Sequence, residues 1–166
     1  MESLPTQVIK LKTEILIKPY NLIKELDEIL YKKLCDKFIN KCSKKNGYVL
    51  SINPGIQIED NTININGNIL FKVIFLAKIY KPKKDQVVSG DIYMIIPEGI
   101  IINIIEDIKV FISVANLKGF KYNEKKQIYE RKSKNETFLK LSQTVKIVIT
   151  DVIFENLKFK CIGKLF

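Results

Sequence analysis

The stretch that decides the fold is FKVIFLAKIYKPKKDQVVSGDIYMIIPEG, which runs from Phe71 to Gly99. Residues Ile69–Tyr80 overlap the beginning of this stretch and are apolar on both faces near their centre. They predict a long central strand covered by a helix. Pro82 then interrupts the pattern, because proline has no N–H to donate to a sheet. A second predicted strand follows over residues 86–96. No histidine, cysteine or acidic cluster lies in this stretch, so it indicates a structural junction without chemistry of its own.

The interruption at Pro82–Asp85 is the predicted domain boundary. The sequence predicts one domain over residues 1–83 and a second over residues 84–166. A chain of 166 residues is long enough for two small domains, each with a modest core. No internal repeat or low-complexity segment separates the two halves, so the boundary depends on the change of pattern alone.

The first domain is expected to combine strands with one helix. Alternating apolar residues predict a strand over Gln7–Lys18. An amphipathic helix of about five or six turns then follows, with Asn21 as its N-cap and its end at Asn46–Gly47. Short strands come next, one before a turn at Asn53–Gly55 and two before a turn at Asn66–Asn68. This order predicts a small α+β domain.

The second domain is expected to contain strands alone. Five candidates occupy residues 86–96, 99–105, 108–114, 144–153 and 159–166. A long lysine-rich connection separates the third candidate from the fourth. Five short antiparallel strands with this spacing are typical of an OB-fold barrel, and Gly90 suits the bend that such a barrel needs.

Catalytic chemistry has little support in the sequence. The chain has no histidine, and none of the common phosphate-binding, hydrolase or metalloprotease motifs occurs. Cys35, Cys42 and Cys161 form no CxxC pair and are interpreted as reduced thiols. The acidic pair Glu106–Asp107 lies between two predicted strands, where a polar hairpin turn explains it. We therefore expect a binding protein that is not an enzyme and holds no metal or cofactor.

A membrane-bound location is not expected. No apolar run reaches the roughly 18 to 20 uncharged residues that a spanning helix needs. The first ten residues, MESLPTQVIK, lack the basic-then-apolar order of a signal peptide. The sequence therefore predicts an intracellular protein with no membrane partner.

The formal net charge of +10 favours an acidic partner such as nucleic acid. Lysine, isoleucine and asparagine are abundant and there is a single arginine, a bias typical of an AT-rich genome, so clustering is better evidence than the total. One lysine cluster falls at the predicted end of the first-domain helix, where it suits the helix dipole. The second cluster lies in the long connection and consists of Lys118, Lys121, Lys125, Lys126, Arg131, Lys132 and Lys134.

Aromatic residues accompany the second cluster. OB-folds bind single-stranded nucleic acid on a barrel face and the surrounding loops, where basic residues contact phosphates and aromatic rings stack on bases. Phe111 lies in an alternating strand near that face, as does Tyr93, and it is open to two interpretations, a stacking platform or a core residue. In the connection, beside Phe120, we expect Tyr122 and Tyr129 to be exposed; the alternative is that they pin the connection down.

Several segments occur in a characteristic order: EILIKP, KNGYVLSI, FKVIFLAKIYKP, QVVSGDIYMIIPEGIIINI and KVFIS. In this order the chain resembles the stalk subunit shared by archaeal and eukaryotic RNA polymerases, the family that comprises the seventh subunit of RNA polymerase II and its archaeal homologue. The resemblance covers the whole chain, although each motif is a loose pattern of apolar residues, glycine and proline.

The resemblance implies an RNP-like α+β tip domain that docks on the polymerase core near the clamp, followed by an OB-fold that contacts emerging RNA. It implies three partners: the core subunits, a smaller helical subunit homologous to the fourth subunit, and nascent single-stranded RNA. The implied core-docking residues are Tyr48, Pro54, Gly55, Ile56, Asn66 and Gly67. The implied RNA-binding residues are Lys118, Lys121, Tyr122, Lys125, Lys126, Tyr129, Arg131, Lys132 and Lys134.

Two departures from the family pattern keep alternatives open. After Pro82 the chain lacks the usual glycine and glutamate, and Ile100–Ile102 stand where the family tends to carry a phenylalanine. The missing aromatic favours an assembly-only subunit without an RNA role, and a stand-alone OB-fold RNA-binding protein is the third possibility. Divergence with AT-rich bias fits a viral polymerase, working in a cytoplasmic viral factory or virion, or a protist polymerase in the nucleus.

Overall fold

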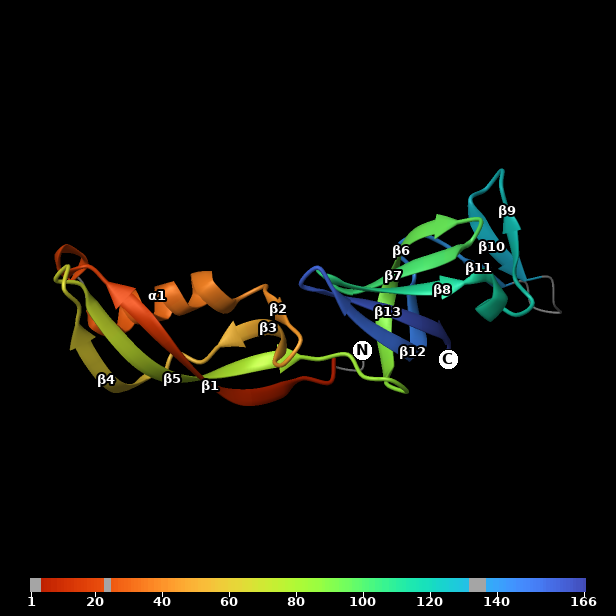
Figure 1. Cartoon of the computed structure of the whole chain (residues 1–166). Helices are drawn as coiled ribbons and strands as arrows, with labels where there is room; N and C mark the ends of the chain where they lie inside the picture. The colour runs from red at the N-terminus through yellow and green to blue at the C-terminus, as the bar shows by residue number, and fades with distance from the viewer. Residues whose placement is uncertain (1–3, 23–24, 132–136) are drawn as a thin grey trace. The chain divides into compact units, whose positions relative to one another are not determined.

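The computed structural model describes residues 4–22, 25–131 and 137–166 (Figure 1). The chain divides into two compact units. One unit is Thr6–Lys81, and the other is Pro82–Phe166 together with Leu4 and Pro5.

The Thr6–Lys81 unit is an antiparallel sheet with one helix packed on it. Its elements are β1 (Gln7–Ile17), a 3-10 turn (Pro19–Asn21), α1 (Leu26–Phe38), β2 (Cys42–Ser43), β3 (Gly47–Ile52), β4 (Gln57–Ile63) and β5 (Ile69–Tyr80). The strand order is β1-β5-β3-β2, and β4 pairs with β5 on the same side as β3. The predicted long central strand is therefore confirmed as β5, which pairs with β1, β3 and β4.

The core of this unit lies between α1 and one face of the sheet. Leu30 and Leu34 of α1 are fully buried and belong to the same cluster as Phe75 and Ile17. The ring of Phe38 lies 5.2 Å from that of Phe75, centroid to centroid. Figure 1 shows α1 lying over one side of the sheet. Alternation along β5 places every second side chain against the helix, because successive strand residues point to opposite faces.

The predicted helix is wrong at both ends. Asn21 belongs to the 3-10 turn, and Glu25 occupies the N-cap position. The helix stops at Phe38 because Ile39 is extended and Asn40 has a φ of 58°. Asn40 then donates to the Val49 carbonyl at 3.0 Å, and β2 pairs with β3. Pairing with the sheet therefore replaces the last turns that the apolar spacing predicted.

The two short strands expected between residues 56 and 65 are one strand, β4, with an irregularity after Ile58.

The second unit contains a closed five-stranded barrel, as the sequence predicted. Its strands are β6 (Val87–Ile96), β7 (Gly99–Ile105), β8 (Ile108–Ser113), β12 (Thr144–Glu155) and β13 (Lys158–Leu165). They close in the order β6-β7-β8-β13-β12, and the β8–β13 pair is parallel whereas the others are antiparallel. Buried apolar side chains of all five strands fill the interior, among them Ile92, Ile102, Val110, Ile149 and the thiol of Cys161.

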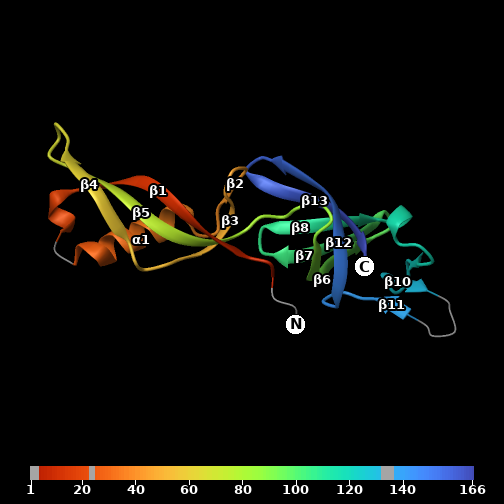
Figure 2. The same ribbon diagram turned by 90° about the horizontal axis from the view of Figure 1, so that it is seen from below.

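The lysine-rich connection is not simply a loop. It contains a 3-10 turn (Val114–Asn116) and a three-stranded sheet of β9 (Lys121–Asn123), β10 (Ile128–Arg131) and β11 (Thr137–Leu139) (Figure 2). We call this sheet, from Leu117 to Lys140, the inserted sheet. Its strands have three or four residues each, too short for an alternating pattern to reveal them in the sequence.

Gly90 of β6 lies where the backbone of β7 comes very close. A Cβ at this position would lie 2.6 Å from the Asn103 carbonyl oxygen and 2.7 Å from Ile102 Cγ2. The close approach of β6 to β7 therefore excludes any side chain there.

Within the described residues, no helix has the length and apolar character needed to cross a bilayer.

Candidate nucleic-acid interface

Tyr129 holds the inserted sheet against the barrel. Its side chain is fully buried, and its hydroxyl lies 2.9 Å from the Ile96 carbonyl oxygen and 2.8 Å from that of Pro97. The Tyr122 ring packs beside it at 5.3 Å. Burial raises the pKa of the Tyr129 hydroxyl above its usual value, so it remains a hydrogen-bond donor. The expectation that Tyr129 is exposed is therefore wrong, because the β6–β7 turn offers carbonyl partners that the sequence does not reveal.

Replacing Tyr129 by phenylalanine should loosen the inserted sheet. The change removes the donor to two partly buried carbonyls, which costs about 1–2 kcal/mol. We expect faster amide hydrogen exchange over β9–β11, measured by mass spectrometry, with exchange in Thr6–Lys81 unchanged. Tyr122→Phe is the matched control, because the Tyr122 hydroxyl has no hydrogen-bond partner among the described residues. Equal acceleration in both variants would contradict the pinning role.

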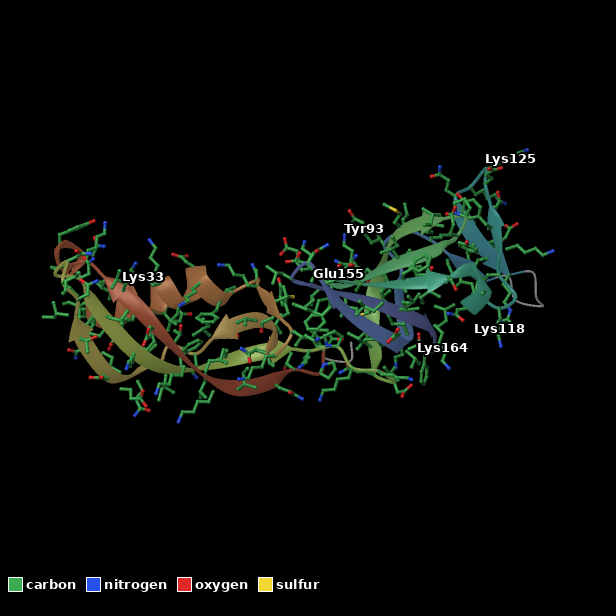
Figure 3. The ribbon with its side chains drawn as sticks, in the orientation of Figure 1. Lys33, Tyr93, Lys118, Lys125, Glu155 and Lys164 are labelled. Carbon is green, nitrogen blue, oxygen red and sulfur yellow. The ribbon has the colours of Figure 1, made fainter. Side chains whose placement is uncertain are left out.

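The inserted sheet presents a group of exposed cations. Lys118, Lys121, Lys125, Lys126 and Arg131 are all exposed. Figure 3 shows Lys125 at the tip of the β9–β10 hairpin and Lys118 at the edge of the barrel. Two acids accompany them, Glu124 and Glu130, and the Asn123 side chain donates to Glu130 at 3.3 Å. The structure thus brings five predicted cations onto one inserted element; Lys132 and Lys134 lie outside the described residues.

Two half-buried rings on the inserted sheet each have a cation beside them. The Arg131 guanidinium lies 6.0 Å from the centroid of Phe120, and the Lys140 ammonium lies 5.4 Å from that of Phe138. Phe138 and Lys140 were not among the predicted site residues. A short strand-like alternation is their signal in the sequence. In the structure Leu139 is buried, whereas Phe138 and Lys140 on either side of it are not. Rings paired with cations suit stacking on a base next to a phosphate.

The outer face of the barrel offers a second aromatic group. Tyr93, which is labelled in Figure 3, is 54% exposed, and the Lys109 ammonium lies 3.9 Å from its ring centroid. Phe111 is half-buried on the outer face, whereas its neighbours Val110 and Ile112 are in the core. The interpretation of Phe111 as a core residue is therefore wrong. Phe111 lines an open hollow of about 400 Å³ between β7, β8 and β13.

The charges around this outer hollow largely cancel. Lys158 lies 3.0 Å from Asp107, and Lys160 lies 2.5 Å from Glu155. The hydrogen bond from Lys160 lowers the pKa of Glu155, so this carboxylate stays ionised. Phosphate attraction is therefore weak at the outer hollow, where apolar groups such as Phe111 and Ile101 dominate. The inserted sheet is the stronger electrostatic partner for a nucleic-acid backbone.

The residues implied to dock on a polymerase core do not form one surface. Tyr48 is buried and its hydroxyl donates to Asn40 Oδ1 at 3.1 Å. Tyr48 pairs with Tyr80 at one end of β5, whereas the Asn66–Gly67 turn follows β4 at the other end. The two ends of β5, Ile69 and Tyr80, are eleven residue steps apart, roughly 36 Å at about 3.3 Å per residue.

The exposed turns of this group remain available for contact. Pro54 and Gly55 form an exposed turn in which the Gly55 N–H donates to Asn53 Oδ1 at 2.9 Å, and Ile56 packs partly into the core. At the Asn66–Gly67 turn two apolar residues were missed, Ile63 at 72% exposure and Ile65 fully exposed. Large exposed apolar side chains at a turn are a signal for protein contact.

The thiols and acids form no metal centre in the described part of the chain, where no three ligating side chains gather. Cys35 and Cys42 are half-buried, and Cys161 is inside the barrel. Burial raises the pKa of the Cys161 thiol to about 12, which makes it a poor nucleophile and metal ligand.

Comparison with known proteins adds no family to this geometry. No protein-family model matches the chain, and no curated protein matches it in sequence. The support for a function is therefore the geometry described above together with the order of motifs in the sequence.

Proposed function

We propose that this protein is a non-catalytic stalk subunit of a DNA-directed RNA polymerase. In this proposal the Thr6–Lys81 unit is an RNP-like domain that docks on the core enzyme near the clamp, and the barrel is an OB-fold that contacts emerging RNA. A smaller helical subunit pairs with it. Beyond docking and RNA contact it contributes no chemistry, metal or cofactor.

The observation that carries the proposal is the barrel with its inserted sheet. Closure in the order β6-β7-β8-β13-β12, with β8 and β13 parallel, is the arrangement expected of a five-stranded OB-fold. The inserted sheet lies between the third and fourth barrel strands and carries the exposed cations and the ring–cation pairs. Such a combination suits sequence-tolerant binding of single strands. In the first unit, exposed Ile63 and Ile65 offer an apolar contact for docking.

Binding of RNA should depend on the lysines of the inserted sheet. Replacing Lys118, Lys121, Lys125 and Lys126 by alanine is expected to reduce the slope of log affinity against log salt by about 0.7 per lost phosphate contact, or roughly 3 in all. The measurement is fluorescence anisotropy with a labelled single-stranded uridine oligonucleotide over a range of salt concentrations. Folding of the variant is checked by circular dichroism.

A control variant removes the same charge elsewhere. Lys32, Lys33, Lys44 and Lys45 belong to α1 and the β2–β3 turn, and their replacement by alanine should leave most of the salt dependence intact. If both variants lose affinity equally, binding reflects net charge alone and the inserted sheet is not the RNA site.

Co-purification from the native source tests the polymerase assignment. A tagged chain is expected to bring down the large polymerase subunits and one smaller helical protein in fixed ratio. Recovery as a free monomer that binds RNA would support the stand-alone alternative. The assembly-only alternative is favoured by the aliphatic Ile101 and the balanced charges at the outer hollow. It predicts co-purification without crosslinks from RNA to the barrel.

A further inference from the structure

One long edge of the sheet in the Thr6–Lys81 unit has no strand beside it. β1 lies at the end of the strand order β1-β5-β3-β2 and, among the described strands, pairs with β5 alone. This pairing continues without a change of register over all 11 residues from Gln7 to Ile17, so the other edge of β1 is equally long and regular. The backbone N–H and C=O groups on such an edge are a template for a further strand.

A lysine of α1 contacts this edge. The Lys37 ammonium donates to Thr13 Oγ1 at 2.9 Å and to the Glu14 carbonyl oxygen at 3.1 Å. A lysine is a common protection for an exposed sheet edge. The Lys37 side chain is itself exposed, so the backbone N–H of an added strand can replace its ammonium. The edge is therefore protected by one movable side chain and is not covered by an element of the fold.

The sequence of β1 is complementary to itself in one antiparallel register. Alternation places five exposed residues on the sheet face away from α1: Val8, Lys10, Lys12, Glu14 and Leu16. If a second β1 runs antiparallel with Lys12 opposite Lys12, then Lys10 lies opposite Glu14 and Val8 opposite Leu16, each pair formed twice. A shift by two residues in one direction places Lys10 opposite Lys12 twice. A shift in the other direction places Leu16 opposite Lys10 and leaves Val8 beyond the end of the partner strand.

The first register also covers exposed apolar surface. Val8 is 66% exposed and Leu16 is 43% exposed, although both belong to a regular strand. Pairing them across the two copies removes both from water at each end of the contact. The central lysines are the one like-charged pair, and each Lys12 already forms an ion pair with Glu59 of β4 in its own chain. Their mutual repulsion is therefore reduced.

On the other face of the sheet, an open hollow of about 470 Å³ lies between β1 and α1. Its lining consists of Glu14, Ile15, Leu16, Lys33, Asp36 and Lys37. In the same register, Ile9 of the second copy lies opposite Ile15 and on the face that α1 covers. The hollow thus has room for the Ile9 side chain beside Ile15, with the aliphatic part of Lys33 as a further apolar contact.

We propose that two copies of this chain associate by antiparallel pairing of their β1 strands about a two-fold axis at Lys12. A single pair of strands is a small contact compared with the roughly 1,600 Å² of a standard interface, so the dimer is in reversible equilibrium with the monomer. The inference goes beyond the proposed function and depends neither on RNA binding nor on a polymerase.

Cysteine crosslinking tests the register. Directly opposed residues of antiparallel strands have Cα atoms about 4.5–5.5 Å apart, which is within the range of a disulfide. With copper phenanthroline as the oxidant of the two thiols, the full chain with Lys12→Cys should give a disulfide-linked dimer on a non-reducing gel. Val8→Cys and Leu16→Cys chains should crosslink when they are mixed and not when each is alone. The wild-type chain gives the background from its own cysteines, Cys35, Cys42 and Cys161.

Sedimentation velocity tests the association itself. The mass of the wild-type chain should rise toward twice 19.2 kDa as its concentration is raised. Lys10→Glu places two carboxylates opposite each other at both ends of the contact and should abolish this rise. Lys10→Glu combined with Glu14→Lys exchanges the two charges and should restore it. Lys78→Glu makes the same change of charge on β5, away from the edge, and should leave the dimer intact.

Several results would overturn the pairing. A wild-type chain that stays monomeric at every concentration is one, and a dimer that persists in Lys10→Glu is another. Val8→Cys chains that crosslink alone as strongly as in the mixture would show random collision instead of a fixed register. Circular dichroism checks that each variant is folded, and the cysteine experiment remains valid if Lys10→Glu is unstable. None of these results bears on RNA affinity or on co-purification with a polymerase, so the proposed function is tested separately.

Discussion

Replacing Gly99 by alanine is expected to destabilise the barrel more than any surface change. A Cβ at Gly99 would lie 2.1 Å from the Ile112 carbonyl oxygen, far inside any allowed contact. That oxygen belongs to the backbone of β8, which pairs with β7, so relief requires the two strands to separate locally. Overpacking of this kind costs typically 1–3 kcal/mol, and with a backbone atom as the obstacle we expect about 3 kcal/mol. Urea unfolding followed by circular dichroism measures the loss.

Gly67→Ala is the matched control. Gly67 has a φ of +74°, and no atom lies within 4 Å of where its Cβ would be. The substitution therefore meets only the backbone cost of the left-handed conformation, about 1–2 kcal/mol. If Gly99→Ala costs no more than Gly67→Ala, the close approach of β7 to β8 is not what keeps glycine at position 99.

Replacing Phe75 by alanine should have the largest effect in the Thr6–Lys81 unit. Phe75 is 1% exposed, packs against Phe38 and belongs to the cluster shared by α1 and the sheet. Removing such a ring loses its burial and leaves a cavity, at a cost of about 3–5 kcal/mol. This is comparable to the whole stability of many small domains, about 5 kcal/mol at the low end. We expect a large fall in the urea midpoint, with lost helical signal.

The neighbouring residue gives the control for this prediction. Leu76 is 41% exposed, and on β5 it points to the face opposite Phe75. Leu76→Ala removes a similar kind of side chain from a solvated face and should cost less than about 1 kcal/mol. Similar losses for both variants would mean that the helix does not define the buried face.

Strands were the best predicted elements. β5 and β7 have the bounds expected from the sequence, because their continuous apolar runs end at a proline-marked junction, a glycine turn or an acidic turn. The helix end was not predictable in the same way. Ile39 continues the apolar spacing, yet the segment from Asn40 onward is paired with β3. The local spacing of apolar residues does not show whether a segment is more stable as a further helical turn or when paired with a strand several residues further along the chain.

The sequence predicted the positive charge of the candidate site but not how its residues are arranged. The exposed lysines of the inserted sheet follow from sequence clustering, since a solvated cluster needs no specific partner. Tyr129 lies in the same segment and was expected to be exposed, but its hydroxyl meets carbonyls 32 and 33 residues away. The implied docking residues were treated as one group, whereas the register spreads them along β5.

The sequence by itself determined the bounds of β5 and β7, that the second half would close as five strands, and where exposed positive charge would collect. These properties depend on neighbouring residues, through alternation, turn chemistry and local composition. Only the tertiary structure decided that Tyr129 is buried and anchors the inserted sheet, that Phe111 faces outward, and that Asp91 of β6 is opposite Asn103 of β7. Each of these depends on strand register and closure, which bring together residues far apart in the chain.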